Sequence, residues 1–215
     1  TAPEVSQMFG EIVGAFLAHS WRMMGSPDPV RLVELGPGRA TLMLDLLRTF
    51  RAVPGLLPAA EIHLVETSPR LRAAQAYRLK EHGFEASWHD SLDTVPEGPM
   101  LLAANEFFDA LPIRQRVMRD GAWRRRMVGI GADDGLCFLD TGPEDNTAIP
   151  PHLIEAPEGT VIEDCPAARE IAAGIGHRLA RDTGVALIID YGYREPAHGD
   201  SLQALRGKRP ADPLE

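Results

Sequence analysis

Apolar and polar residues follow one another along the chain in a pattern that predicts alternating helices and buried strands. Over residues 3–24 apolar side chains recur every three or four positions, which predicts a long amphipathic helix. Short apolar runs with few polar interruptions follow, as expected for strands buried on both faces of a parallel sheet. We expect five such strands, at residues 32–35, 62–66, 84–88, 100–104 and 185–189.

Helical periodicity fills three of the intervals around these strands, at residues 41–53, 69–82 and 166–181. Ser68 is a suitable N-cap for the second of these helices, and Pro69 fits its first turn. Strands that alternate with helices are typical of the α/β class. We therefore predict a doubly wound, mostly parallel, Rossmann-like sheet within one domain that spans residues 1–215.

The pattern changes to that of an antiparallel hairpin between residues 113 and 141. Strand-like runs at residues 115–118 and 123–130 flank an Asp120-Gly121 turn, and residues 136–139 suggest a third strand. We expect an antiparallel β insertion here. Both ends of the sequence look cut, with a proline-rich loop expected at the tail, so we expect a fragment of a longer protein.

A strand, a glycine turn and a helix follow one another at residues 32–50. Gly36 and Gly38 form the turn, and glycine lets a ligand approach the backbone closely. The helix that starts at Thr41 offers unpaired N–H groups. Glu34 ends the strand, where open α/β sheets bind their ligands. We predict that Glu34, Gly36 and Gly38 bind a cofactor; a purely structural turn is the alternative.

Acidic residues also end the next two strands. Glu66 follows the second strand about two dozen residues beyond the turn, where such folds hold ribose hydroxyls. Asp90 follows the third strand and suits an exocyclic amino group of adenine. An ordinary loop or helix-cap role for Asp90 is the alternative. Three acids in succession at strand ends favour a ligand site.

The segment after the fourth strand is rich in chemical groups. Two carboxylates, an amide and two aromatic rings lie within residues 105–109, where a substrate would meet a ligand held by the glycine turn. The alternative places both rings in the core and makes Asp109 a cap. Asp190 and Tyr191 follow the fifth strand and bring further polar groups to the same edge of the sheet.

The glycine turn lacks one feature of the dinucleotide fingerprint. A third glycine or alanine is expected three residues after Gly38, and that position is Thr41. A nicotinamide-dependent Rossmann oxidoreductase is therefore the weaker of two enzyme interpretations.

Charge and cysteine content exclude several classes of partner. The net charge of -9 argues against a nucleic-acid-binding surface. Cys137 and Cys165 are far apart and have no histidine or cysteine at ligand spacing, so we predict no disulfide framework and no metal site. No apolar run reaches membrane-spanning length, so we expect no membrane span.

Several segments closely resemble one family of enzymes. Residues 34–39, 88–92, 105–112 and 190–192 resemble the MidA-like family of class I S-adenosylmethionine-dependent methyltransferases, and residues 1–7 match it too. The most specific part is the Asn-Glu-Phe-Phe-Asp-Ala block at residues 105–110, whereas the glycine motif is shared with many methyltransferases. Mitochondrial members of this family are protein arginine methyltransferases that assist the assembly of respiratory complex I.

The resemblance implies that the cofactor is S-adenosyl-L-methionine. Gly36 and Gly38 would admit its methionine and ribose parts. Glu66 would accept its ribose hydroxyls, and Asp90 would orient the adenine. The methyl group would pass to an arginine of a protein. Carboxylate side chains can hold the guanidinium group of that arginine. The residues assigned to the acceptor side are Glu106, Asp109 and Asn105 as catalytic groups, with Phe107, Phe108, Asp190 and Tyr191 as substrate-binding groups.

Relatives differ from this chain at the start of the first helix and in length. Most carry glycine where this chain has Ala40, which narrows the room there, and they extend beyond both ends of this sequence. The resemblance implies a protein substrate such as a respiratory complex subunit, in the cytoplasm of a bacterium or in the mitochondrial matrix of a eukaryote. An assembly protein that keeps the fold without turnover is a further alternative.

Overall fold

A computed structural model describes residues 2–147, 149–192, 194–195, 197–207 and 209–214. The chain divides into two compact units, one formed by Thr1–Ala110 with Ala168–Tyr191 and the other by Leu111–Ala167 with Gly192–Glu215. A single domain over residues 1–215 stays a prediction. Among the described residues, no helix combines the length and the apolar character that crossing a bilayer requires.

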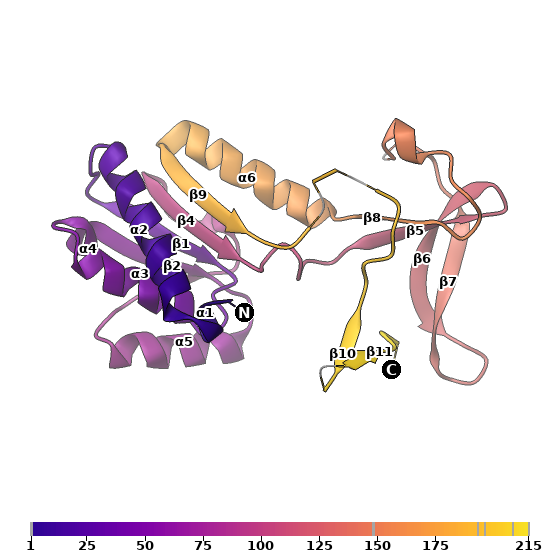
Figure 1. The fold of residues 1–215 in the computed structure, drawn as a ribbon, viewed down its shortest axis with the longest axis horizontal. Helices are drawn as coiled ribbons and strands as arrows, with labels where there is room; N and C mark the ends of the chain where they lie inside the picture. Colours follow the sequence, from indigo (N-terminus) through magenta and orange to yellow (C-terminus); the bar gives the residue numbers. More distant parts are fainter. Residues whose placement is uncertain (1, 148, 193, 196, 208, 215) are drawn as a thin grey trace. The chain divides into compact units, whose positions relative to one another are not determined.

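The first unit is built on a five-stranded parallel sheet (Figure 1). Its strands are β1 (Val30–Leu35), β2 (Ala60–Val65), β3 (Ser87–His89), β4 (Met100–Asn105) and β9 (Gly184–Ile189). Their spatial order is β3-β2-β1-β4-β9, so the chain first moves outward on one side of β1 and then continues on the other side with β4. This arrangement confirms the predicted doubly wound α/β sheet.

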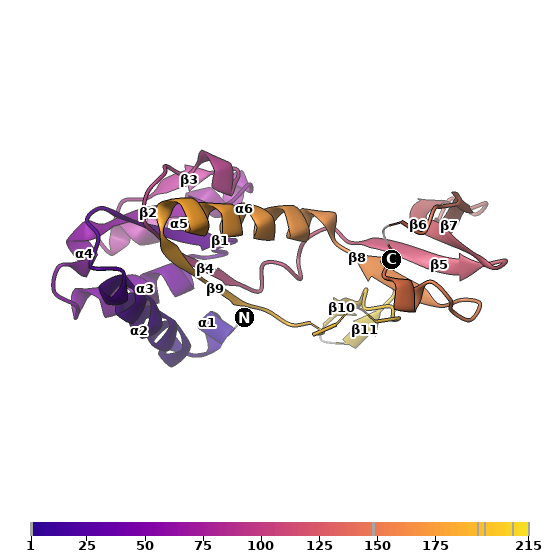
Figure 2. The same cartoon turned by 90° about the horizontal axis from the view of Figure 1, so that it is seen from above.

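Helices cover both faces of this sheet (Figure 1 and Figure 2). One face carries α2 (Gln7–Met23), α3 (Thr41–Arg51), α4 (Leu56–Ala59) and α5 (Pro69–Glu81), and the other carries α6 (Pro166–Asp182) and the 3₁₀ turn η1 (Leu92–Thr94). The side chains between the sheet and α2, α3, α4 and α5 form the first core layer, and those between the sheet and α6 with η1 form the second core layer. Alternate residues of a strand point to opposite faces, so Leu32 packs in the first core layer and Val33 in the second. Both strand residues are fully buried.

The helix expected over residues 3–24 is two helices, α1 (Ala2–Val5) and α2. The break falls at Ser6, whose backbone is extended with φ −144° and ψ 115°. The Ser6 side chain makes no capping hydrogen bond, and the Ser6 carbonyl accepts from the N–H of Phe9 over 3.1 Å, so a new helix starts after the extended residue although the apolar periodicity continues.

The third strand begins later than expected, at Ser87 instead of residue 84. The reason lies in the end of α5, where Gly83 has φ +78° and the N–H of Phe84 donates to the carbonyl of Leu79 over 2.9 Å. This closing turn directs Phe84 back onto the first core layer, so its backbone does not join the sheet.

Glycine lets α2 and α3 approach each other closely. Gly10 and Gly14 lie one turn apart on the buried side of α2. A Cβ atom on Gly14 would lie 2.8 Å from the Cβ of Thr49, and a Cβ atom on Gly10 would overlap the side chain of Asp45. A side chain at either position would therefore force the helices apart.

We expect Gly14→Ala to lower the free energy of unfolding by about 1–3 kcal/mol, the usual effect of overpacking. The matched control is Gly176→Ala in α6, because nothing lies within 4 Å of the methyl group it adds. An exposed helical glycine replaced by alanine should gain about 0.4–1 kcal/mol. Urea denaturation measures both variants, and equal gains would show that the contact between α2 and α3 tolerates a side chain.

The second unit contains a four-stranded antiparallel sheet of β5 (Arg114–Arg119), β6 (Ala122–Ile130), β7 (Leu136–Pro143) and β8 (Val161–Asp164). Their order is β7-β6-β5-β8. The predicted hairpin and its third strand are present. The short strand that the sequence indicates at residues 160–163 is also present as β8, and it joins the sheet as a fourth strand beside β5. Trp123 lies at the centre of this unit's core and is 1% exposed, near the 3₁₀ turn η2 (Pro151–Leu153).

The tail was expected to form a loop, and this expectation is wrong in part. The strands β10 (Ala204–Arg206) and β11 (Arg209–Ala211) pair antiparallel there. Gly207, with φ +59°, supplies the backbone conformation that a tight hairpin connection requires.

Candidate functional site

The glycine turn after β1 depends on residues with positive φ. Gly36 has φ +61° and Gly38 has φ +52°. A Cβ atom on Gly36 would lie 2.7 Å from the Phe107 ring, whereas nothing lies within 4 Å of a Cβ atom on Gly38. Gly36 is therefore required by packing inside the protein. At Gly38 glycine provides the left-handed backbone and leaves open space above it.

Ala40 also has a left-handed backbone, with φ +58°, and precedes α3. A non-glycine residue in this conformation is strained by roughly 1–2 kcal/mol. Its methyl group is fully buried in the first core layer and does not line the cavity beside the turn. The methyl group therefore strains the backbone, and the expected narrowing of the cofactor space at this position is not found.

A cavity of about 200 Å³ lies beside the glycine turn. Its walls come from the ends of β1 and β4, from the turn itself, from α1 and from the start of α3. Because β1 and β4 are neighbours from which the sheet extends in opposite directions, this is the place where open α/β sheets bind their ligands. The lining residues include the predicted Glu34, Gly36, Gly38, Asn105 and Glu106, together with Pro3, Glu4, Pro37, Arg39, Thr41 and Leu42.

Glu34 is the buried acid of this cavity, with 4% of its surface exposed. Burial raises the pKa of its carboxyl group to about 8, although the backbone N–H of Met43 donates to it and opposes that rise. Its Oε2 atom has no hydrogen-bond partner among the described residues. A buried carboxyl oxygen without a partner is unfavourable unless a ligand supplies one.

Glu66 lies at the end of β2 with both carboxylate oxygens directed by hydrogen bonds. Oε1 accepts from the backbone N–H of Ser68 over 2.8 Å, and Oε2 accepts from the side chain of Gln75 over 3.4 Å. Each oxygen keeps a further lone pair for a ligand hydroxyl. Sequence patterns did not assign any role to Gln75, although a polar residue between Leu71 and Leu79 on the buried side of a helix was a visible signal.

Asp90 is exposed and paired. Its Oδ1 atom accepts from Arg72 over 2.7 Å, and the carboxylate is 81% exposed. The same guanidinium donates from Nε to the carbonyl of Glu66 over 2.6 Å. Arg72 therefore links the ends of β2 and β3. The N-cap of the following turn is Ser91, so Asp90 does not occupy that capping position.

The segment after β4 turns sharply. Glu106 has φ +48°, and its N–H donates to the carbonyl of Ile189 over 2.9 Å. The rings of Phe107 and Phe108 meet edge to face with centroids 5.3 Å apart, and both pack against the second core layer. Both rings therefore lie in the core, as the alternative interpretation of the sequence expected. Their role in binding a substrate stays a prediction.

Asp190 shapes this segment from the end of β9. Its Oδ2 atom accepts from the backbone N–H groups of Phe108 and Asp109, over 2.8 Å and 3.1 Å. The Asp109 carboxyl has its pKa raised, first by burial and then by the negative charges of Asp190 and Glu106. In the described part of the chain, no arginine or lysine forms an ion pair with Asp109 or Asp190. Tyr191 is 78% exposed beside them.

The structure thus brings the acids predicted from sequence to one edge of the sheet, at the ends of neighbouring strands. Those that line the cavity are Glu34 and Glu106, and Glu66 is joined to the glycine turn through Gln75. Asp90 lies at the outer end of this row. Within the described ranges, no three histidine, cysteine or acidic side chains are arranged to hold a metal ion.

The chain matches the family model described as "Putative S-adenosyl-L-methionine-dependent methyltransferase" over residues 12–215. It is 34% identical to the mitochondrial protein arginine methyltransferase NDUFAF7 homolog of Drosophila melanogaster, over the whole chain and 54% of the fly protein. It is also 34% identical to the mitochondrial protein arginine methyltransferase NDUFAF7 of Danio rerio, over the whole chain and 56% of the fish protein. The chain spans about half the length of these curated relatives.

Two crystal structures from Burkholderia thailandensis are similar to this fold. An uncharacterized protein aligns with a TM-score of 0.74 and 27% identity, over 91% of this chain and 51% of that one. A second member of its superfamily, bound to S-adenosyl-homocysteine, aligns with a TM-score of 0.71 and 26% identity, over 90% of this chain and 49% of that one.

Proposed function

Because the chain belongs to this family of S-adenosyl-L-methionine-dependent methyltransferases, we propose that the whole protein binds S-adenosyl-L-methionine beside the glycine turn and methylates an arginine of a protein. One observation carries the proposal. The buried carboxyl of Glu34, with an unpartnered oxygen, lines the cavity where the two halves of the sheet diverge. A cationic ligand in that cavity would supply the missing partner.

The residues around the glycine turn suit the groups of this cofactor. When bound, the cofactor supplies a methyl group already activated by its sulfonium sulfur. Glu34 accepts from the cationic methionine part, in the space that Gly36 and Gly38 leave open. Glu66 accepts from the ribose hydroxyls. Asp90 accepts from the adenine amino group with Oδ2, since Oδ1 already accepts from Arg72 and Oδ2 keeps both of its lone pairs.

For the acceptor arginine we propose Glu106, Asp109 and Asn105 as the groups that hold it. A guanidinium stays protonated near neutral pH and is a weak nucleophile. Carboxylates that accept its N–H groups fix the planar fork and localise its charge. Burial and then the negative charges of Asp190 and Glu106 raise the pKa of Asp109, and such a cation would oppose both effects. Phe107, Phe108, Asp190 and Tyr191 complete the proposed substrate side.

The names of the relatives guide the choice of acceptor and compartment. Those named above are mitochondrial protein arginine methyltransferases. We therefore propose a protein substrate, with a subunit of a respiratory complex as the first to test. The compartment proposed is the mitochondrial matrix for a eukaryotic host and the cytoplasm for a bacterial one.

Transfer of a labelled methyl group from the cofactor to proteins of a host extract tests the proposal. The expected result is label on arginine, found by mass spectrometry of the labelled protein. Binding of S-adenosyl-homocysteine without any transfer would favour a non-catalytic assembly protein. Binding of NAD, with no binding of S-adenosyl-homocysteine, would favour the oxidoreductase alternative.

Ribose recognition gives a separate prediction. Glu66→Ala should weaken S-adenosyl-homocysteine binding by roughly 1.5–3 kcal/mol, the range for hydrogen bonds to a charged group. The unliganded protein should lose only about 1 kcal/mol of stability, because the Ser68 N–H loses its acceptor. Calorimetry measures both quantities, with the exposed Glu81→Ala as a control of equal charge change. A large loss of stability with unchanged affinity would make Glu66 a structural residue.

A further inference from the structure

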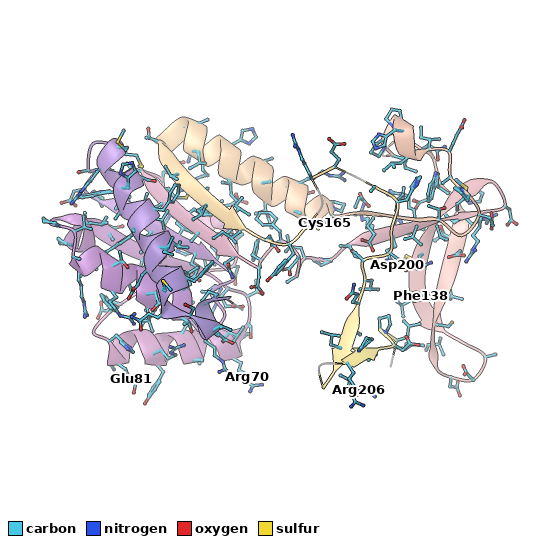
Figure 3. All side chains as sticks on the ribbon, viewed as in Figure 1. Arg70, Glu81, Phe138, Cys165, Asp200 and Arg206 are labelled. Atoms are coloured by element: carbon cyan, nitrogen blue, oxygen red, sulfur yellow. The ribbon has the colours of Figure 1, made fainter. Side chains whose placement is uncertain are left out.

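Gln75 is a fully buried polar residue in α5, with 0% of its surface exposed. The outer side of the same helix is charged, and Arg70 and Glu81 project away from the sheet (Figure 3). The inner side packs on the first core layer through Leu79. A glutamine on that side must find hydrogen-bond partners, because an unpaired amide in the core is unfavourable by a few kcal/mol.

The partners of Gln75 come from the glycine turn after β1, from the residue that follows β2 and from β3. Its Nε2 atom donates to the carbonyl of Gly38 over 2.8 Å and to Oε2 of Glu66 over 3.4 Å. Its Oε1 atom accepts from the indole N–H of Trp88 over 2.8 Å. Trp88 belongs to β3 and lies two residues before Asp90.

The chemistry of these partners leaves one orientation for the amide. An indole N–H can only donate, and a backbone carbonyl can only accept. Exchanging the oxygen and nitrogen of Gln75 would place donor against donor at Trp88 and acceptor against acceptor at Gly38. The bonds therefore fix the side chain, and through it the distance between the glycine turn and Glu66.

We propose that Gln75 is a positioning residue for the cofactor: it holds the glycine turn and the ribose-binding carboxylate at the spacing that one bound molecule needs. This inference rests on the proposed function. Gly38 has a left-handed backbone and its carbonyl lies outside the regular bonds of β1 and α3, so the Gln75 amide is what anchors it. Arg78, one turn further along α5, donates to the next carbonyl, that of Arg39, over 2.7 Å.

The test compares Gln75→Met, which keeps length and burial but removes the amide, with Leu79→Ala, a core change on the same side of α5. The probe is S-adenosyl-homocysteine, titrated by calorimetry, and thermal melting reports folding. Gln75→Met should weaken binding by about tenfold, as expected when one or two hydrogen bonds are removed. Leu79→Ala should lower the melting temperature and leave the affinity within about twofold.

A double-variant cycle separates positioning from a merely structural role. Gln75 acts partly through Glu66, so the losses of affinity in Gln75→Met and Glu66→Ala should not be independent. In the double variant, the fold-loss of affinity should be smaller than the product of the two single fold-losses by about threefold or more. Independent losses, or a Gln75→Met protein that binds like the parent, would overturn the positioning role alone. A parent protein that does not bind the probe would overturn the proposed cofactor, and this inference with it.

Discussion

Glu34→Gln is expected to stabilise the unliganded protein at pH 8 by up to roughly 5 kcal/mol. Burial raises the pKa of the Glu34 carboxyl from 4.5 to about 8. Between these values the folded protein keeps a proton that the unfolded chain releases, so raising the pH favours unfolding. Glutamine has no proton to lose. Its advantage should therefore be near zero below pH 4.5 and should grow until pH 8.

Urea denaturation of the parent protein and of Glu34→Gln at several pH values between 4.5 and 8 measures this difference in stability. Glu81→Gln, at an exposed position of α5, is the control for the loss of one carboxyl group. The cavity around Glu34 also contains Glu4, Arg39 and Glu106, whose charges are common to all three proteins. A Glu34→Gln advantage that does not change with pH would show that the carboxyl is ionised in the folded state.

The same substitution should weaken S-adenosyl-homocysteine binding, by roughly 1.5–3 kcal/mol, since glutamine cannot ionise to accept from the cationic amino group of the ligand. Stability and affinity are thus expected to move in opposite directions. This combination is typical of a group retained for its function, because a purely structural residue would lose stability when replaced. Unchanged affinity in the more stable variant would remove Glu34 from the proposed site.

Glu106→Gln and Asp109→Asn are each expected to reduce methyl transfer to a protein arginine by about tenfold or more. Each change keeps the size of the side chain and removes the charge that would hold the guanidinium. Asp109 suits this test because the bonds that shape its turn use its backbone N–H and the Asp190 carboxylate. The turn should therefore survive the substitution. Initial rates with labelled cofactor measure the effect in the full-length protein.

The affinity for S-adenosyl-homocysteine separates acceptor binding from cofactor binding in these variants. It should change by less than about twofold if the two carboxylates act on the acceptor. Asp93→Asn, on the exposed turn η1, is the charge-matched control and should transfer methyl groups at the parent rate. Parent-like rates in both test variants, or losses of activity and cofactor in equal measure, would contradict the acceptor role of this segment.

Local patterns were sufficient to predict the strand, turn and helix around Gly36 and Gly38, since each depends on residues close in sequence. Membership of the methyltransferase family confirms the resemblance that those motifs indicated. The alternation of strands and helices likewise predicted the parallel sheet. The acids at the strand ends could be predicted because parallel strands place their carboxyl ends at one edge.

Features that depend on contacts distant in sequence could not be predicted in this way. Gln75 bonds to a residue 37 positions earlier, and its polarity alone did not reveal a partner. The short strand at residues 160–163 could be predicted, but its pairing with β5 could not, because β8 joins β5 only after a long connection. Burial of Glu34 depends on the packing of α3 over β1, so the strongly raised pKa of its carboxyl became apparent only with the fold.

Asp190 has a consequence for how the segment after β4 could diversify in this protein. Its carboxylate is committed to the N–H groups of Phe108 and Asp109, so β9 determines the course of the segment that follows β4. The Phe107 and Phe108 rings are held by the core, but the Glu106 and Asp109 side chains can be exchanged without disturbing these bonds, because Asp190 binds backbone N–H groups only. New acceptor preferences could therefore evolve by single substitutions around a constant anchor, whereas loss of the anchor would have to be compensated in two strands at once.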